Sequence, residues 1–76
     1  AALEKQGKHA ECEAAYREAI RIRPEHAEPH ARLAVVLEKL GRADEALAAC
    51  REAARLEPGD PRHRHALAAL ARRIRA

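Results

Sequence analysis

The sequence predicts an all-α protein, an α-solenoid of antiparallel helix pairs with about five helices, the first of them partial. The main observation is an internal repeat, because residues 1–24 match residues 35–58 at 12 of 24 positions when the chain is aligned with itself at an offset of 34. The repeated residues of the first copy are Leu3, Glu4, Lys5, Gly7, Glu11, Ala14, Ala15, Arg17, Glu18, Ala19, Arg21 and Pro24. The second observation is that apolar residues recur at the spacing of one helix face. A fixed period of this size is typical of stacked helical units that share one core.

The beginning of the chain predicts the end of one helix followed by a complete second helix. Residues 1–6 form the first, because Gly7 stands where a left-handed residue would close it. The second covers residues 9–22, and Pro24 stops it, since proline lacks the N–H that another turn would use. Its predicted inward residues are Cys12, Tyr16, Ala19 and Ile20.

The middle of the chain predicts another pair of helices, which end at a Gly and a Pro as the first pair does. The first covers residues 27–40 and tolerates Pro29 in its first turn, where no intrahelical N–H bond is lost. Gly41 closes it, and the second helix covers residues 43–56 before Pro58. Their predicted inward residues are Leu33, Ala34, Leu37 and Leu40 on the first, and Ala46, Leu47, Cys50, Ala53 and Ala54 on the second.

The last segment, residues 61–76, predicts a single helix that covers the apolar face left open by the preceding one. Asp60 is a good N-cap residue, and Pro61 suits the first helical position. The predicted inward residues are Leu67, Leu70, Ala71 and Ile74.

Composition excludes several classes of function. The chain has 15 Lys and Arg residues against 12 Asp and Glu, and residues 61–76 contain five basic residues and no acidic one. Ser and Thr are absent, so Tyr16 is the only hydroxyl side chain. No apolar run approaches the roughly 20 residues of a membrane span, and we expect no membrane partner. The excess of Arg over Lys suggests a bacterial source, and we take the cytoplasm as the expected location.

The His and Cys residues do not predict a chemical site. His26 and His30 are four residues apart, but no Cys lies near them, and zinc requires four well-placed ligands. His63 and His65 likewise suit an ordinary surface or rim. Cys12 and Cys50 lie on predicted inward stripes, where a free Cys acts as a small apolar residue. We therefore expect no catalytic residue, no metal and no cofactor.

Residues 27–60 resemble one tetratricopeptide repeat, a helix-turn-helix unit of 34 residues with the pattern W-x2-L-G-x2-Y, A-x3-F and P. Leu33 and Ala34 match its Leu-Gly pair, Gly41 its turn and Pro58 its final proline. The sequence departs from the pattern at the large positions, which are occupied by His30, Leu37 and Cys50.

The resemblance extends over the whole chain and implies its division into units. Residues 1–26 are similar to part of a preceding repeat, residues 27–60 form a complete repeat, and residues 61–76 resemble the family's capping helix. The implied fold is a right-handed superhelix.

The resemblance also implies a function, because such stacks bind peptides or helices of other proteins on a concave surface lined by the first helix of each unit. By this alignment Glu28, Ala31 and Glu38 face that surface, and the predicted partner-binding residues are Arg32, Val35, Lys39, Arg62, His65, Ala69, Arg72 and Arg73. A surface with Arg32, Lys39, Arg62 and Arg72 would favour an acidic peptide. The chain is thus predicted to be a non-catalytic interaction or scaffold module.

Other functions stay open at this point. The chain begins partway through a repeat, which would suit a segment that recruits substrate to a larger enzyme. The basic residues 61–76 could bind nucleic acid through its phosphates, although no aromatic side chains are present there for stacking. A stack of fewer than three repeats is usually unstable alone, so we also expect self-association through the open N-terminal face, or easy melting.

Overall fold

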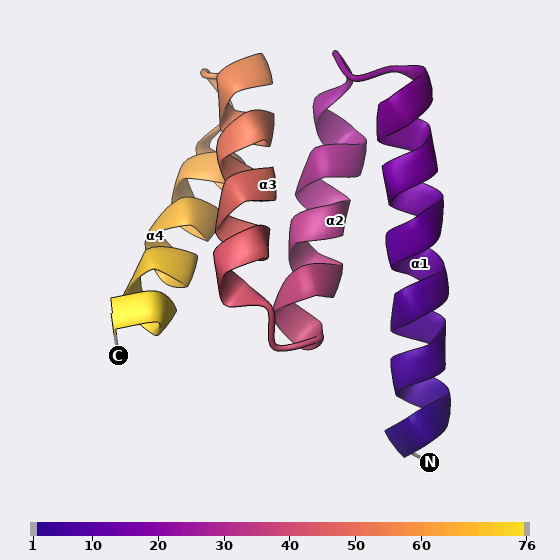
Figure 1. Cartoon of the computed structure of the whole chain (residues 1–76). Helices are drawn as coiled ribbons and strands as arrows, with labels where there is room; N and C mark the ends of the chain where they lie inside the picture. The colour runs from indigo at the N-terminus through magenta and orange to yellow at the C-terminus, as the bar shows by residue number, and fades with distance from the viewer. Residues whose placement is uncertain (1, 76) are drawn as a thin grey trace.

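The computed structural model describes the backbone of residues 2–75 and the side chains of residues 8–74. This part of the chain is all-helical, without β-strands, and its elements are α1 (Ala2–Ile22), α2 (Ala27–Lys39), α3 (Ala43–Leu56) and α4 (Pro61–Arg75). Figure 1 shows α1, α2 and α3 side by side in a row, with α4 against α3. The predicted all-α class is confirmed, but the expected number of about five helices was wrong, because this part of the chain has four.

The difference lies at Gly7, where a break between two helices was predicted. The structure has one continuous helix over 21 residues, with Gly7 inside it. A glycine within a helix costs only about 0.5–1 kcal/mol relative to alanine. A break at Gly7 would leave unsatisfied N–H and C=O groups at two new helix ends. Extension of the longer helix through Gly7 is therefore the more stable arrangement.

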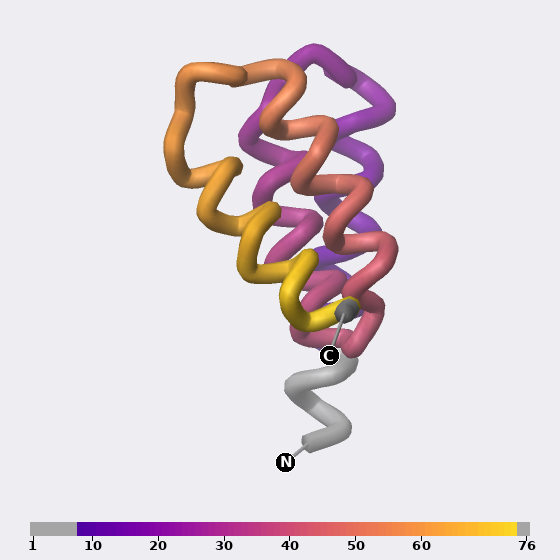
Figure 2. The backbone as a smooth tube through the Cα atoms, turned by 90° about the vertical axis from the view of Figure 1, so that its left-hand side faces the viewer, coloured from indigo at the N-terminus to yellow at the C-terminus, as the bar shows by residue number. Residues whose placement is uncertain are grey.

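Each helix packs on the next one in the sequence, and α2 with α3 forms the most extensive pair. The molecule is a slab of 38 × 35 × 15 Å. Figure 2 shows α4 in front of the other helices and inclined to α3. An ion pair of 2.8 Å between Arg42 and Glu13 also joins the turn after α2 to α1.

The core lies around α3 and the adjoining faces of α2 and α4. Its buried residues are Leu33, Ala34, Leu37, Ala46, Ala49, Cys50 and Leu70. Tyr16 and Ile20 pack against this cluster from α1, as predicted, but Cys12 does not, because its side chain is exposed. The prediction that Cys12 is buried was wrong because the stripe that α1 turns toward α2 carries Tyr16 and Ile20, and Cys12 lies to one side of it. Ile74 is 39% exposed at the end of α4.

The turns follow the predicted residues closely. Gly41 has a left-handed φ of 80°, and its N–H donates to the Glu38 carbonyl while the Arg42 N–H donates to Leu37. These two bonds form a Schellman motif, which satisfies the last carbonyls of α2. At the start of α4, a side-chain oxygen of Asp60 accepts the Arg62 N–H at 2.9 Å, so the predicted N-cap is confirmed.

Candidate functional site: a groove between α2 and α4

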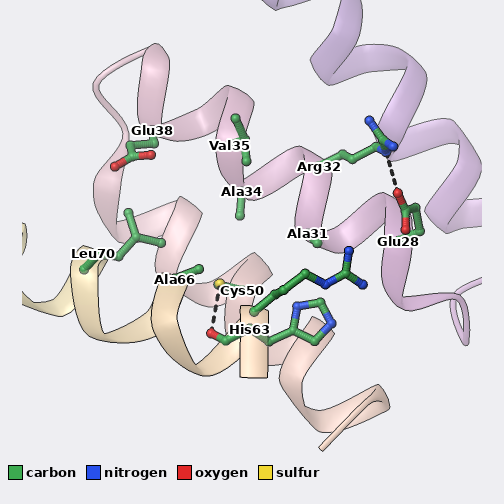
Figure 3. A pocket seen from close by; sticks show the side chains of 12 residues that line it. Glu28, Ala31, Arg32, Ala34, Val35, Glu38, Cys50, His63, Ala66 and Leu70 are labelled. Carbon is green, nitrogen blue, oxygen red and sulfur yellow. Dashed lines mark hydrogen bonds and ion pairs between the residues drawn. The ribbon is translucent and has the colours of Figure 1, made fainter. Parts of the chain in front are cut away.

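A cavity of about 340 Å³ lies between α2 and α4, with Cys50 of α3 among its lining residues. Half of its twelve lining residues are alanine or larger aliphatic residues, namely Ala31, Ala34, Val35, Ala66, Ala69 and Leu70. Figure 3 shows Ala34 and Val35 on the α2 side and Ala66 and Leu70 on the α4 side. Because four of the six are alanines, their side chains leave the space between the two helices unfilled. We call this space, with its lining residues, the α2–α4 groove.

Charged side chains border the α2–α4 groove, and each is paired within the chain. Arg32 donates to Glu28 at 2.7 Å, Arg62 lies 2.7 Å from Asp60, and Arg73 of α4 pairs with Glu38 of α2. The hydrogen bond from Arg62 lowers the pKa of Asp60 to about 2. The hydrogen bond to Glu28 raises the pKa of Arg32. The border therefore carries both signs of charge.

The structure brings half of the predicted partner-binding residues into the lining of the groove. Arg32, Val35, Arg62 and Ala69 line it, and Val35 is 50% exposed although aliphatic. Arg73 lies beside it through its ion pair with Glu38. Lys39, His65 and Arg72 are exposed but do not line it. His65 and Arg72 each precede a residue of the stripe that faces the groove, which consists of Arg62, Ala66, Ala69 and Arg73. One position along a helix turns a side chain by about 100°, so His65 and Arg72 face away from the groove.

A comparison with protein families identifies the architecture. Residues 3–70 match the model of the tetratricopeptide repeat. The chain belongs to this family. Repeats of this family mediate protein–protein interaction or scaffolding and are typically non-catalytic. A comparison with curated proteins found no significant match.

In this tetratricopeptide repeat chain, two histidines that were predicted to be ordinary surface or rim residues are buried. His30, at the family's Trp position, is 8% exposed, and its Nε2 lies 3.1 Å from the Pro24 carbonyl oxygen. His63 is 5% exposed, with Nε2 at 2.9 Å from a Glu57 carboxylate oxygen. Their hydrogen bonds to the turns between helices explain how two polar rings fit among packed helices.

One cluster of potential metal ligands was not found from the sequence. Side-chain donors of Glu57, Asp60 and His63 lie within 4.8 Å of one another, and the signal for it is the spacing of three residues between successive members. Arg62 already donates to both oxygens of Asp60. A cation would have to displace this guanidinium, so the cluster is better explained as the capped turn that starts α4.

The buried thiol of this tetratricopeptide repeat chain, Cys50, is not activated. Burial raises the pKa of the Cys50 thiol, which donates weakly to the His63 carbonyl oxygen at 3.8 Å. A protonated, buried thiol is a poor nucleophile. Within residues 2–75 no helix is both long and apolar enough to cross a membrane.

Proposed function

We propose that this chain is a non-catalytic interaction module that binds a peptide or a helix of another protein in the α2–α4 groove. The observation that carries the proposal is the groove itself, an apolar hollow with charged borders in a family whose repeats mediate protein–protein interaction. A right-handed superhelical arrangement of the helices, which presents α2 and α4 on one concave side, is part of the same proposal.

An apolar side chain of the partner would fill the groove. It would cover Val35 and Ala69. The exposure of Val35 is unusual, because the other aliphatic residues Leu33, Val36 and Leu37 of α2 are buried. Burial of one large aliphatic side chain contributes about 1.5–3 kcal/mol, so one or two such anchors would supply much of the affinity of a weak complex. The alanine lining keeps room for them.

An acidic residue of the partner would lie beside Arg32 and Arg62. The side chains of both arginines are well exposed, at 60% and 73%, in spite of their ion pairs. Exposed ion pairs contribute only about 0–1 kcal/mol, so a new carboxylate can share or replace the existing one. Arginine can also bind two carboxylates at once, because it has five N–H donors.

The experiment selects phage-displayed random peptides of about 12 residues on the immobilised chain and measures their affinity by fluorescence anisotropy. Val35→Glu should weaken binding at least about tenfold, because it puts a charge against the apolar anchor. Ile22→Glu is the matched control, since Ile22 is also an exposed aliphatic residue but lies on α1. Equal affinity of the Val35→Glu variant and the control would refute the proposed site.

A second pair of variants tests whether the groove prefers an acidic partner. Arg32→Glu and Arg55→Glu both place a second glutamate beside an exposed partner on the same helix, Glu28 and Glu52 respectively. Only the first is in the groove. A loss of affinity confined to Arg32→Glu supports the acidic partner, whereas equal effects would restrict the proposal to the apolar anchor.

A further inference from the structure

Two helix faces of the described structure lack the neighbour that their counterparts in the repeat possess. An offset of 34 residues aligns α1 with α3 and the start of α2 with the start of α4. In the central pair, α3 packs on α2. The face of α3 that meets α2 has a counterpart on α1, and the face of α2 that meets α3 has a counterpart on α4.

The first face is on α1 and consists of Cys12, Ala15, Ala19 and Ile22, which we call the α1 outer face. Their counterparts on α3 are Ala46, Ala49, Ala53 and Leu56. Ala46 and Ala53 are completely buried, and Ala49 is 9% exposed. Cys12 and Ala15 are exposed, and Ile22 is 63% exposed. Leu56 and Ala19 are both half-buried. Most of this small and apolar surface is thus covered on α3 and uncovered on α1.

The second face is on α4 and consists of Pro61, Arg64, Ala68 and Ala71, which we call the α4 outer face. Their counterparts on α2 are Ala27, His30, Ala34 and Leu37, all of them buried. Pro61, Arg64 and Ala68 are exposed, and Ala71 is half-buried. The α4 outer face therefore also lacks a covering helix in the described structure, and small side chains at its centre would permit close approach of one.

We propose that a second copy of this chain docks its α1 outer face on the α4 outer face of the first, as α3 packs on α2. Ala34 and Ala46 belong to the same core cluster between these two helices. Their counterparts Ala68 and Cys12 would meet across the new interface. Because the two docking faces differ, the contact is head-to-tail and leaves one face free at each end, so the assembly grows until it closes into a ring or continues as a filament.

Charge complementarity favours a second copy over an arbitrary helix. Within the central pair, His30 of α2 and Glu52 of α3 line the same hollow. The counterparts are Arg64 on α4 and Glu18 on α1. The docked arrangement would therefore place a permanent cation of one copy near a carboxylate of the other. Both side chains are exposed in the single chain, where Glu18 forms an exposed ion pair with Arg21 that the new contact would share or replace.

Cysteine cross-linking tests the proposed register. In the Ala68→Cys variant, mild oxidation with diamide should join the introduced thiol of one copy to Cys12 of the next, each disulfide forming from two thiols whose hydrogens pass to the diamide. A disulfide requires Cα atoms within about 7 Å, which makes the test specific. Cys50 is 1% exposed and does not compete. The expected result is a ladder of covalent oligomers on a non-reducing gel.

Two control variants make this ladder interpretable. Cys12→Ser combined with Ala68→Cys should form no ladder, and Ala69→Cys, which points into the α2–α4 groove, should form far less. All the changed positions are exposed, so the fold is retained, as circular dichroism can verify. The proposal is overturned if Ala68→Cys stays monomeric, stops at dimers, or reacts no more than Ala69→Cys.

A charge swap provides a second measurement that needs no cysteine. Sedimentation of the unmodified chain should show a mean mass that rises with concentration up to about 1 mM, the range of weak association. Glu18→Arg or Arg64→Glu alone should weaken association about fivefold, the upper range for an exposed ion pair, and the two together should restore it. A monomer at every concentration would mean that these faces serve a different occupant, and would overturn the proposal.

Discussion

Helices α1 and α3 share a sequence pattern but differ in their surroundings. Ala46 of α3 is fully buried, whereas Cys12, its counterpart on α1, is exposed. The reason is that α3 has α2 on one side and α4 on the other, while α1 packs extensively only on α2 among the described helices. A repeated sequence therefore fixes which residues can be buried, and the neighbouring helices decide which are.

The two glycines that the repeat aligns, Gly7 and Gly41, show the same principle in the backbone. Gly41 adopts a left-handed conformation and closes α2, whereas Gly7 lies within α1. Gly41 is followed by a helix that folds back onto α2, and the core cluster joins both. Glycine permits a turn, but packing on both sides of it makes the turn favourable.

The largest expected effect compares Ala46→Leu with Cys12→Leu. Ala46 is enclosed, so three additional carbons should lower the free energy of unfolding by about 1–3 kcal/mol. The same side chain at exposed position 12 should change it by no more than about 0.5 kcal/mol. Urea unfolding followed by circular dichroism at low protein concentration measures both. Equal losses would contradict the contrast between the two helices.

A second comparison concerns Gly41→Ala and Gly7→Ala. Alanine at position 41 must adopt a positive φ of 80°, which should destabilise the chain by about 1–2 kcal/mol. Alanine at position 7 should instead stabilise it by about 0.5–1 kcal/mol, because the residue is inside a helix. The sign of the second change, from the same unfolding experiment, decides whether α1 is continuous. A loss at position 7 would restore the two-helix prediction.

The smallest effect compares the two helix starts, His26 and Asp60. His26 caps α2 without a side-chain hydrogen bond, whereas Asp60 accepts the Arg62 N–H. The pKa of Asp60 is lowered from 3.8 to about 2, so its contribution to stability is present above pH 3.8 and is lost as the pH falls through 2. Asp60→Asn keeps an oxygen for the cap but cannot titrate. Its melting temperature should fall less steeply between pH 4 and pH 2 than that of the unmodified chain. Parallel curves of melting temperature against pH would contradict the stabilising role of the ionised Asp60 cap.

The sequence predicted three of the four helices to within one residue at their described ends, because glycine and proline act locally. Gly41 and Pro58 mark turns whose backbone requirements do not depend on the rest of the fold. It failed at Gly7 and Cys12, where the outcome depends on how α1 packs and not on the residue itself. Neither residue carries a local signal for that packing.

The candidate site was predictable only in part, for a similar reason. Helical spacing placed Arg32 and Val35 on one face of α2, and both line the groove. The ion pair between Glu38 and Arg73 joins residues 35 positions apart, which no local pattern reveals. Burial of His30 and His63 likewise depends on turns that fold back over the rings.

The sequence by itself determined the helical architecture, the turns and the family, because these follow from periodicity and from the backbone limits of glycine and proline. The tertiary structure decided which of two equivalent faces is covered, how the arginines are neutralised and where an apolar hollow remains. Burial and charge pairing depend on distances between separate helices, and such distances are set only when the helices pack.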